Sequence, residues 1–98
     1  MILNHLDLPV SDILKARKFF EHYFDFKCIF EREDGLTVLL DKIGFALTLS
    51  YSEICDYPIG FHIGFMLKTE KELLDNYNKF VNSDIQIVRT IGILGEAL

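Results

Sequence analysis

A pattern of one strand followed by one helix occurs twice in this chain of 98 residues, and no other feature constrains its fold as much. The second copy begins at His62, which aligns with His5 in the first. At the same offset, apolar residues fall on apolar residues: Leu6 on Ile63, Leu8 on Phe65, Val10 on Leu67, Ala16 on Leu73, Phe20 on Tyr77 and Tyr23 on Phe80. Side chains that share a face recur with a different period in a strand than in a helix, and the apolar residues of the two copies match in both segments. The repeat therefore predicts two related modules.

The first module, about residues 2–52, is predicted to have the order β-α-β-β-β. Its first strand lies within 2–10, where alternate residues Leu6, Leu8 and Val10 are apolar. Pro9 has no N–H to give to a ladder, so it should lie at the end of this strand or on a free edge.

A helix over about 12–24 follows, with an N-cap at Ser11 or Asp12. Three strand candidates come next, over 27–32, 36–40 and 45–52, and Asp34-Gly35 is a hairpin signal between the first two. Alternation in the first of these three places Cys28, Phe30 and Arg32 on one face.

The second module, about residues 61–98, has a predicted strand over 61–67, a helix over about 70–82 and a short strand over 85–89. Thr69 and Glu72 form a capping box before the helix. One or two strands of the first module have no counterpart here, so we expect an open sheet edge and, with it, a homodimer. The expected fold is α+β, a single domain of paired β-α-β-β-β modules with curled mixed sheets, the second incomplete at the C-terminus.

Composition and charge exclude several classes of protein. Half of the residues are hydrophobic and 13% are aromatic, which rules out a disordered chain. No apolar run approaches the ~20 residues of a membrane span. A net charge of −5 with scattered Lys and Arg argues against a nucleic-acid partner. The N-terminus has no basic, apolar leader, and Cys28 and Cys55 are read as reduced thiols, so a cytoplasmic location is expected.

The two repeated histidines are the candidate metal ligands. By alternation, His5 points away from the face that carries Leu6 and Leu8, and His62 does the same in its own strand, with Met66 on its side. If the two sheets curl toward each other, the histidines line a shared cavity. Neutral imidazoles are good ligands for first-row divalent metals, among which Zn, Ni, Mn and Fe are the candidates. A hydrogen-bonded histidine without metal is the alternative, and His22 on the outside of the first helix is interpreted in that way.

The opening Asn4-His5-Leu6-Asp7-Leu8-Pro9-Val10-Ser11-Asp12, with Phe19-Phe20 in the helix, resembles the start of the vicinal oxygen chelate superfamily. This superfamily includes glyoxalase-type lyases, bleomycin-resistance proteins and extradiol dioxygenases. Residues 61–65, Phe-His-Ile-Gly-Phe, resemble the start of its second module.

The resemblance implies four metal ligands, from the first and last strands of both modules. His5 and His62 occupy two of these positions. Thr48 stands at the third, where relatives often have Glu, Gln or His, and Ser50 is its neighbour on the same face. The fourth would follow a turn that the chain does not reach. Thr48, Ser50 and Met66 are therefore candidate ligand-binding residues beside a depleted metal site.

The main functional hypothesis is a small-molecule-binding protein, in which aromatic side chains stack on a flat ligand. The alternative is a metal-dependent lyase, isomerase or dioxygenase acting on a small oxygenated substrate, its metal shell completed by a partner chain. A shortened relative kept for interaction is a third hypothesis. A ferredoxin-like architecture is the alternative fold, but it expects two strands after the first helix, where this chain has three candidates.

Overall fold

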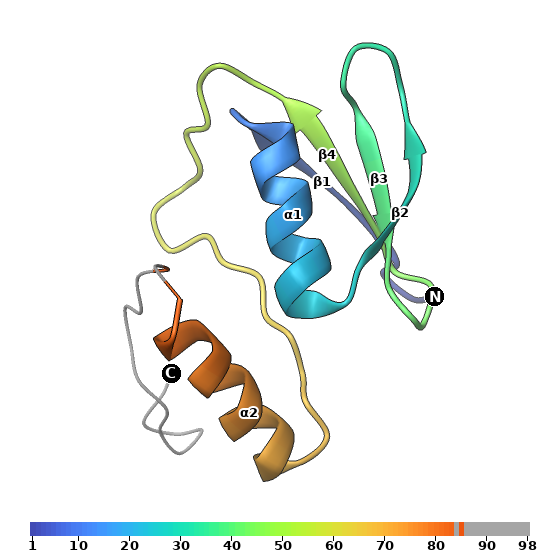
Figure 1. Ribbon diagram of the computed structural model, residues 1–98. Helices are drawn as coiled ribbons and strands as arrows, with labels where there is room; N and C mark the ends of the chain where they lie inside the picture. Colours follow the sequence, from blue (N-terminus) through green and yellow to red (C-terminus); the bar gives the residue numbers. More distant parts are fainter. Residues whose placement is uncertain (84, 86–98) are drawn as a thin grey trace. The chain divides into compact units, whose positions relative to one another are not determined.

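The computed structural model describes residues 1–83 and residue 85 (Figure 1). The chain forms two compact units, Met1–Phe61 and a second unit that begins at His62. The α+β class with a mixed sheet, predicted from the sequence, is confirmed.

The first unit is one helix on a four-stranded sheet. Its elements are β1 (His5–Val10), α1 (Ile13–Phe24), β2 (Lys27–Glu31), β3 (Thr37–Leu40) and β4 (Ala46–Tyr51). The strand order is β1-β4-β3-β2. β1 runs parallel to β4, whereas the β3–β4 and β2–β3 pairs are antiparallel. All four strands predicted for the first module are therefore present.

Pro9 lies in β1, which is an edge strand of this sheet, as its missing N–H predicts. The hydrogen bonds from Ala46 N to Asn4 O and from Ser52 N to Val10 O show which carbonyls of β1 point toward β4. In a parallel ladder, alternate residues point their backbone groups to opposite sides. The backbone groups of His5, Asp7 and Pro9 therefore point to the free edge.

Both ends of α1 have a local cause. Asp12 is the N-cap, and its side chain accepts a hydrogen bond from Lys15 N at 3.0 Å. Asp25 ends the helix in a left-handed conformation, with φ of 56°. Its backbone N–H donates to the carbonyl of Phe20. Asp is among the few residues other than Gly that adopt this conformation readily.

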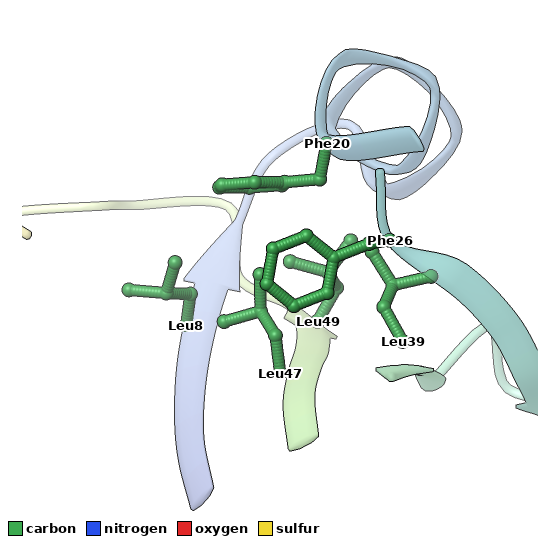
Figure 2. Packing of buried hydrophobic residues seen from close by; sticks show 6 residues of the cluster. All are labelled: Leu8, Phe20, Phe26, Leu39, Leu47 and Leu49. Carbon is green, nitrogen blue, oxygen red and sulfur yellow. The ribbon is translucent and has the colours of Figure 1, made fainter. Parts of the chain in front are cut away.

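The core of the first unit lies between α1 and the sheet (Figure 2). Phe20 points from α1 toward leucines of three strands, and Phe26 closes the side next to β2. The buried apolar residues are Leu8, Phe20, Phe26, Leu39, Leu47 and Leu49.

A β-bulge between Cys28 and Phe30 changes which face each residue of β2 occupies. Cys28 pairs with Leu39 and packs on the core, whereas Phe30 pairs with Val38 on the opposite face. The prediction that Cys28 and Phe30 share one face is therefore wrong. One extra residue in a strand reverses the alternation beyond it.

The second unit is described up to residue 83, with residue 85 in addition. Its helix α2 (Glu70–Val81) is capped by Thr69, whose hydroxyl accepts from Glu72 N at 3.1 Å, as predicted. Residues 61–67 form no strand, so that prediction is wrong. A strand needs a ladder partner, and the described part of this unit has no strand for it to pair with. The predicted strand 85–89 lies outside the described residues except for Ile85.

The turn between β2 and β3 is held by a bidentate ion pair. Arg32 donates from Nε to Asp34 Oδ1 at 2.9 Å and from Nη2 to Oδ2 at 2.6 Å. Leu36 N also donates to this carboxylate, and Gly35 takes a φ of 96°. The Arg32 hydrogen bonds first, and Leu36 N second, lower the pKa of Asp34 from its ordinary 3.8 to about 2.

We expect a carboxyl ¹³C NMR titration to place the pKa of Asp34 near 2, and Arg32→Gln to move it upward toward 3.8. Because the folded pKa is the lower one, the contribution of Asp34 to stability is present above pH 3.8 and is lost as the pH falls toward 2. Lys42→Gln removes the same charge from a lysine that pairs with Asp25 and should leave the titration of Asp34 unchanged. An Asp34 midpoint near 4 in the unmodified protein would contradict this account.

Leu47→Ala should lower the free energy of unfolding by about 2–5 kcal/mol, because Leu47 is only 1% exposed and its removal leaves a cavity. Urea unfolding followed by circular dichroism measures the change. Ile43→Ala, in the β3–β4 turn at 92% exposure, is the control and should alter stability by no more than about 0.5 kcal/mol. Equal losses in the two variants would show that the packing of Figure 2 does not hold the unit together.

Candidate functional site

The sheet of the first unit has two different faces. α1 and the core leucines occupy one face (Figures 1 and 2). Residues that pair directly across strands project to the same side of a sheet, so the strand registers define the opposite face. We call it the His5 face, and its members are His5, Asp7 and Pro9 of β1, Ala46, Thr48 and Ser50 of β4, Val38 and Leu40 of β3, and Lys27 and Phe30 of β2.

His5 and Thr48, which the resemblance assigns to two positions of one site, lie together on this face. Thr48 Oγ1 is 3.4 Å from His5 Nε2. His5 is exposed, whereas Thr48 is only 6% exposed. A buried hydroxyl is stable only with a hydrogen-bonding partner, and the imidazole supplies it. The exposed side of the ring remains accessible to a ligand.

Ser50 and Asp7 form a second polar pair next to the first. Ser50 Oγ donates to Asp7 Oδ1 at 2.9 Å. Ser50 was a predicted site residue, but Asp7 was not. The signal for Asp7 was present in the sequence, because it alternates with Leu6 and Leu8 on the same side of β1 as His5.

One cross-strand row on the His5 face changes from charged to apolar across the sheet. Asp7 of β1 pairs with Thr48 of β4, Thr48 with Val38 of β3, and Val38 with Phe30 of β2. At the far end of this row, Phe30 is 52% exposed. The row thus offers hydrogen bonds and a negative charge at one end and an aromatic ring at the other.

The remaining predicted site residues, His62 and Met66, belong to the second unit. Both are exposed and lie in the stretch before α2 that has no regular structure. Their roles as a metal ligand and a ligand-binding residue, in a cavity shared with His5, remain predictions.

The donor set around His5 does not fit a metal centre that is complete by itself. Such a centre needs about three protein ligands from imidazole, thiolate or carboxylate groups. Among residues 1–83 and 85, no group of three His, Cys, Asp or Glu side chains is placed to hold an ion. The immediate partner of His5 is the hydroxyl of Thr48, a weak ligand for a divalent metal.

A shallow hollow of about 300 Å³ lies away from this face, between the end of β1 and the first turns of α1. Asp12, one of its lining residues, is already engaged as the helix cap. The hollow is therefore a consequence of how α1 begins, and we assign it no ligand.

Comparison with known proteins agrees with this sheet and its single covering helix. The family model of the glyoxalase/bleomycin resistance protein/dioxygenase superfamily matches residues 2–93. The chain belongs to this superfamily, which confirms the resemblance seen in the sequence. No curated protein matches the chain.

Three solved structures are similar to the chain. A possible glyoxalase from Bacillus cereus is 34% identical, with a TM-score of 0.78, over 83% of this chain and 72% of that one. An integron cassette protein from the mobile metagenome of the Halifax Harbour sewage outfall is 12% identical, with a TM-score of 0.67, over 82% of this chain and 68% of that one. The fosfomycin resistance protein FosX of Listeria monocytogenes is 22% identical, with a TM-score of 0.67, over 94% of this chain and 75% of that one. The last two show the shared fold alone.

None of the helices within the described part of the chain has the length and apolar character that crossing a bilayer requires. The cytoplasmic location and the homodimer remain predictions.

Asp7→Asn and Ser50→Ala should each change the free energy of unfolding by less than about 1 kcal/mol, because their hydrogen bond is exposed to solvent. Urea unfolding of both single variants and of the double variant measures this. A loss above about 2 kcal/mol in either single variant would show that the pair has a structural role, and binding data on these variants could not then be read as site effects.

Proposed function

We propose that this protein binds an amphipathic small molecule on the His5 face of its first unit. The observation that carries the proposal is the row Asp7, Thr48, Val38 and Phe30, which orders charged, polar and apolar side chains along one line of the sheet. A ligand with a polar end and a flat apolar body has matching partners along this row.

The chemistry of each end supports this orientation. His5 and Thr48 offer a ring nitrogen and a hydroxyl at a mutual distance of 3.4 Å, and either can donate to or accept from a ligand oxygen. Val38 and Phe30 add apolar surface that loses its contact with water when a ligand covers it. A role in small-molecule binding is in line with the names of two neighbours, a possible glyoxalase and a fosfomycin resistance protein.

A metal-dependent lyase, isomerase or dioxygenase is the second candidate. His5 and membership of the superfamily favour it, and the repeat in the sequence nominates His62 as the second ligand. A divalent ion would supply Lewis acidity toward a ligand oxygen. Because the groups around His5 do not complete a metal shell, we place binding without metal first.

Catechol, which joins two neighbouring oxygens to a flat ring, is a suitable probe for the row. We expect its addition to shift the ¹H–¹⁵N signals of Asp7, Thr48 and Phe30, and Phe30→Ala to weaken binding about five-fold through lost apolar contact. Tyr51→Ala is the matched control, since this exposed aromatic residue pairs with Val10 on the side of α1. Shifts confined to other regions, or equal weakening by both variants, would refute the proposal.

Titration with Zn²⁺ and Mn²⁺ by calorimetry, on protein without an affinity tag, separates the two candidates. If binding needs no metal, catechol affinity is the same with and without either ion. If the metal enzyme is correct, His5→Ala and His62→Ala each lower metal affinity by at least about ten-fold. His22→Ala, which removes the exposed histidine of α1, is the control and should leave metal affinity unchanged.

A further inference from the structure

The segment that follows β4 is attached to the free edge of β1. Ser52 N donates to Val10 O at 2.9 Å on the side of β4, and the hydroxyl of Tyr57 then donates to the carbonyl of Pro9 on the free edge. This carbonyl is one of the edge groups of β1 that do not face β4. The phenol ring of Tyr57 is therefore held beside the strand that carries Asp7.

Tyr57 and Phe61 form a stacked aromatic pair. Their ring centroids are 5.0 Å apart and their planes differ by 11°. A turn fixes the pair, because Phe61 N donates to Pro58 O at 2.9 Å and Gly60 takes a φ of 84°. Tyr57 is 40% and Phe61 46% exposed, so ring surface of both remains accessible.

The carboxylate of Asp7, two residues before Pro9 in β1, can accept a further hydrogen bond. Its Oδ1 accepts from Ser50, and within residues 1–83 and 85 its Oδ2 accepts no hydrogen bond and no cation pairs with it. The Tyr57 hydroxyl is bound at Pro9, two residues along β1 from Asp7. Burial first, and then the charges of Cys55 and Asp7, raise the pKa of Tyr57. Tyr57 therefore remains a neutral ring beside a negative charge.

We infer that Asp7, Ser50, Tyr57 and Phe61 form a subsite for a planar organic cation, such as an amidinium or guanidinium group. The carboxylate attracts the positive charge, and its free oxygen accepts an N–H. Aromatic faces carry negative charge density that attracts a cation. The net charge of −5 adds a weak attraction over longer distances. The inference rests on the proposed function, because it assigns the chemical class of the ligand group at the charged end of the row.

Benzamidinium, benzamide and benzoate test the charge, because the three share one flat ring and carry +1, 0 and −1 at pH 7. Titrations followed by ¹H–¹⁵N NMR should show benzamidinium binding about five-fold more tightly than benzamide, with shifts at Asp7, Ser50 and Tyr57. Benzoate should bind most weakly. Raising the salt concentration should weaken benzamidinium binding and leave benzamide unchanged. Equal affinities for benzamidinium and benzamide would overturn the inference.

Asp7→Asn should remove the preference for benzamidinium, whereas Asp56→Asn, which makes the same charge change next to Tyr57 in the chain, should keep it. Tyr57→Phe retains the ring and should bind within about two-fold of the unmodified protein. Tyr57→Leu loses the ring and should bind about two- to five-fold more weakly. If both Tyr57 variants bind as tightly as the unmodified protein, or Asp56→Asn matches Asp7→Asn, the subsite is wrong.

The two proposals fail differently. If catechol binding depends on Phe30 but benzamidinium has no preference over benzamide, the cation subsite is refuted and the proposed function stands. If catechol does not bind the His5 face while benzamidinium still requires Asp7, the row is refuted and the cation subsite stands as a binding site of its own. Absence of benzamidinium binding overturns the inference whatever catechol does.

Discussion

The parallel pairing of β1 with β4 is the interaction on which the core and the candidate site both depend. Its register runs from His5 opposite Ala46 to Val10 opposite Tyr51 and joins parts of the chain that are far apart in sequence. A shift by one residue would turn every side chain of β1 to the other face. Leu8, Leu47 and Leu49 are buried, so such a shift would lose core contacts. The apolar core thus determines which polar residues meet: Asp7 with Thr48 on the other side of the sheet.

The parts of the site that could be predicted from sequence are those set by local alternation. Period-two patterns placed His5 opposite Leu6 and Leu8 in β1 and put Ser50 on the face of Thr48 in β4, while the resemblance assigned His5 and Thr48 to one site. The structure brings His5 Nε2 to 3.4 Å from Thr48 Oγ1. Both helices could be predicted closely because their N-caps, Asp12 and Thr69, are local signals. Asp7 does not stand at one of the four strand positions that the resemblance implies for metal ligands, so it was not among the predicted site residues. It shares the alternation of His5 and needed no further information.

Other features depend on contacts that a single sequence does not display. The bulge in β2 arises in the pairing of β2 with β3, and it alone decides that Phe30 lies on the His5 face while Cys28 packs on the core. Residues 61–67 carry the same alternation as β1 but form no strand. Alternation gives a segment two faces, but only a ladder partner makes it a strand. β1 has β4, whereas the described residues of the second unit include no such partner.

The change from a charged to an uncharged polar side chain along the row follows from the solvent exposure of each strand position. Asp7 is exposed on an edge strand, where a carboxylate retains much of its hydration, so its charge is tolerated without a paired cation. Thr48 is almost completely buried on the neighbouring strand, and a hydroxyl there needs one partner, which His5 provides. A carboxylate at that position would have to be compensated by a cation because of its burial. With threonine in its place the face has no such requirement, which supports the proposal of a ligand bound by hydrogen bonds and apolar contact.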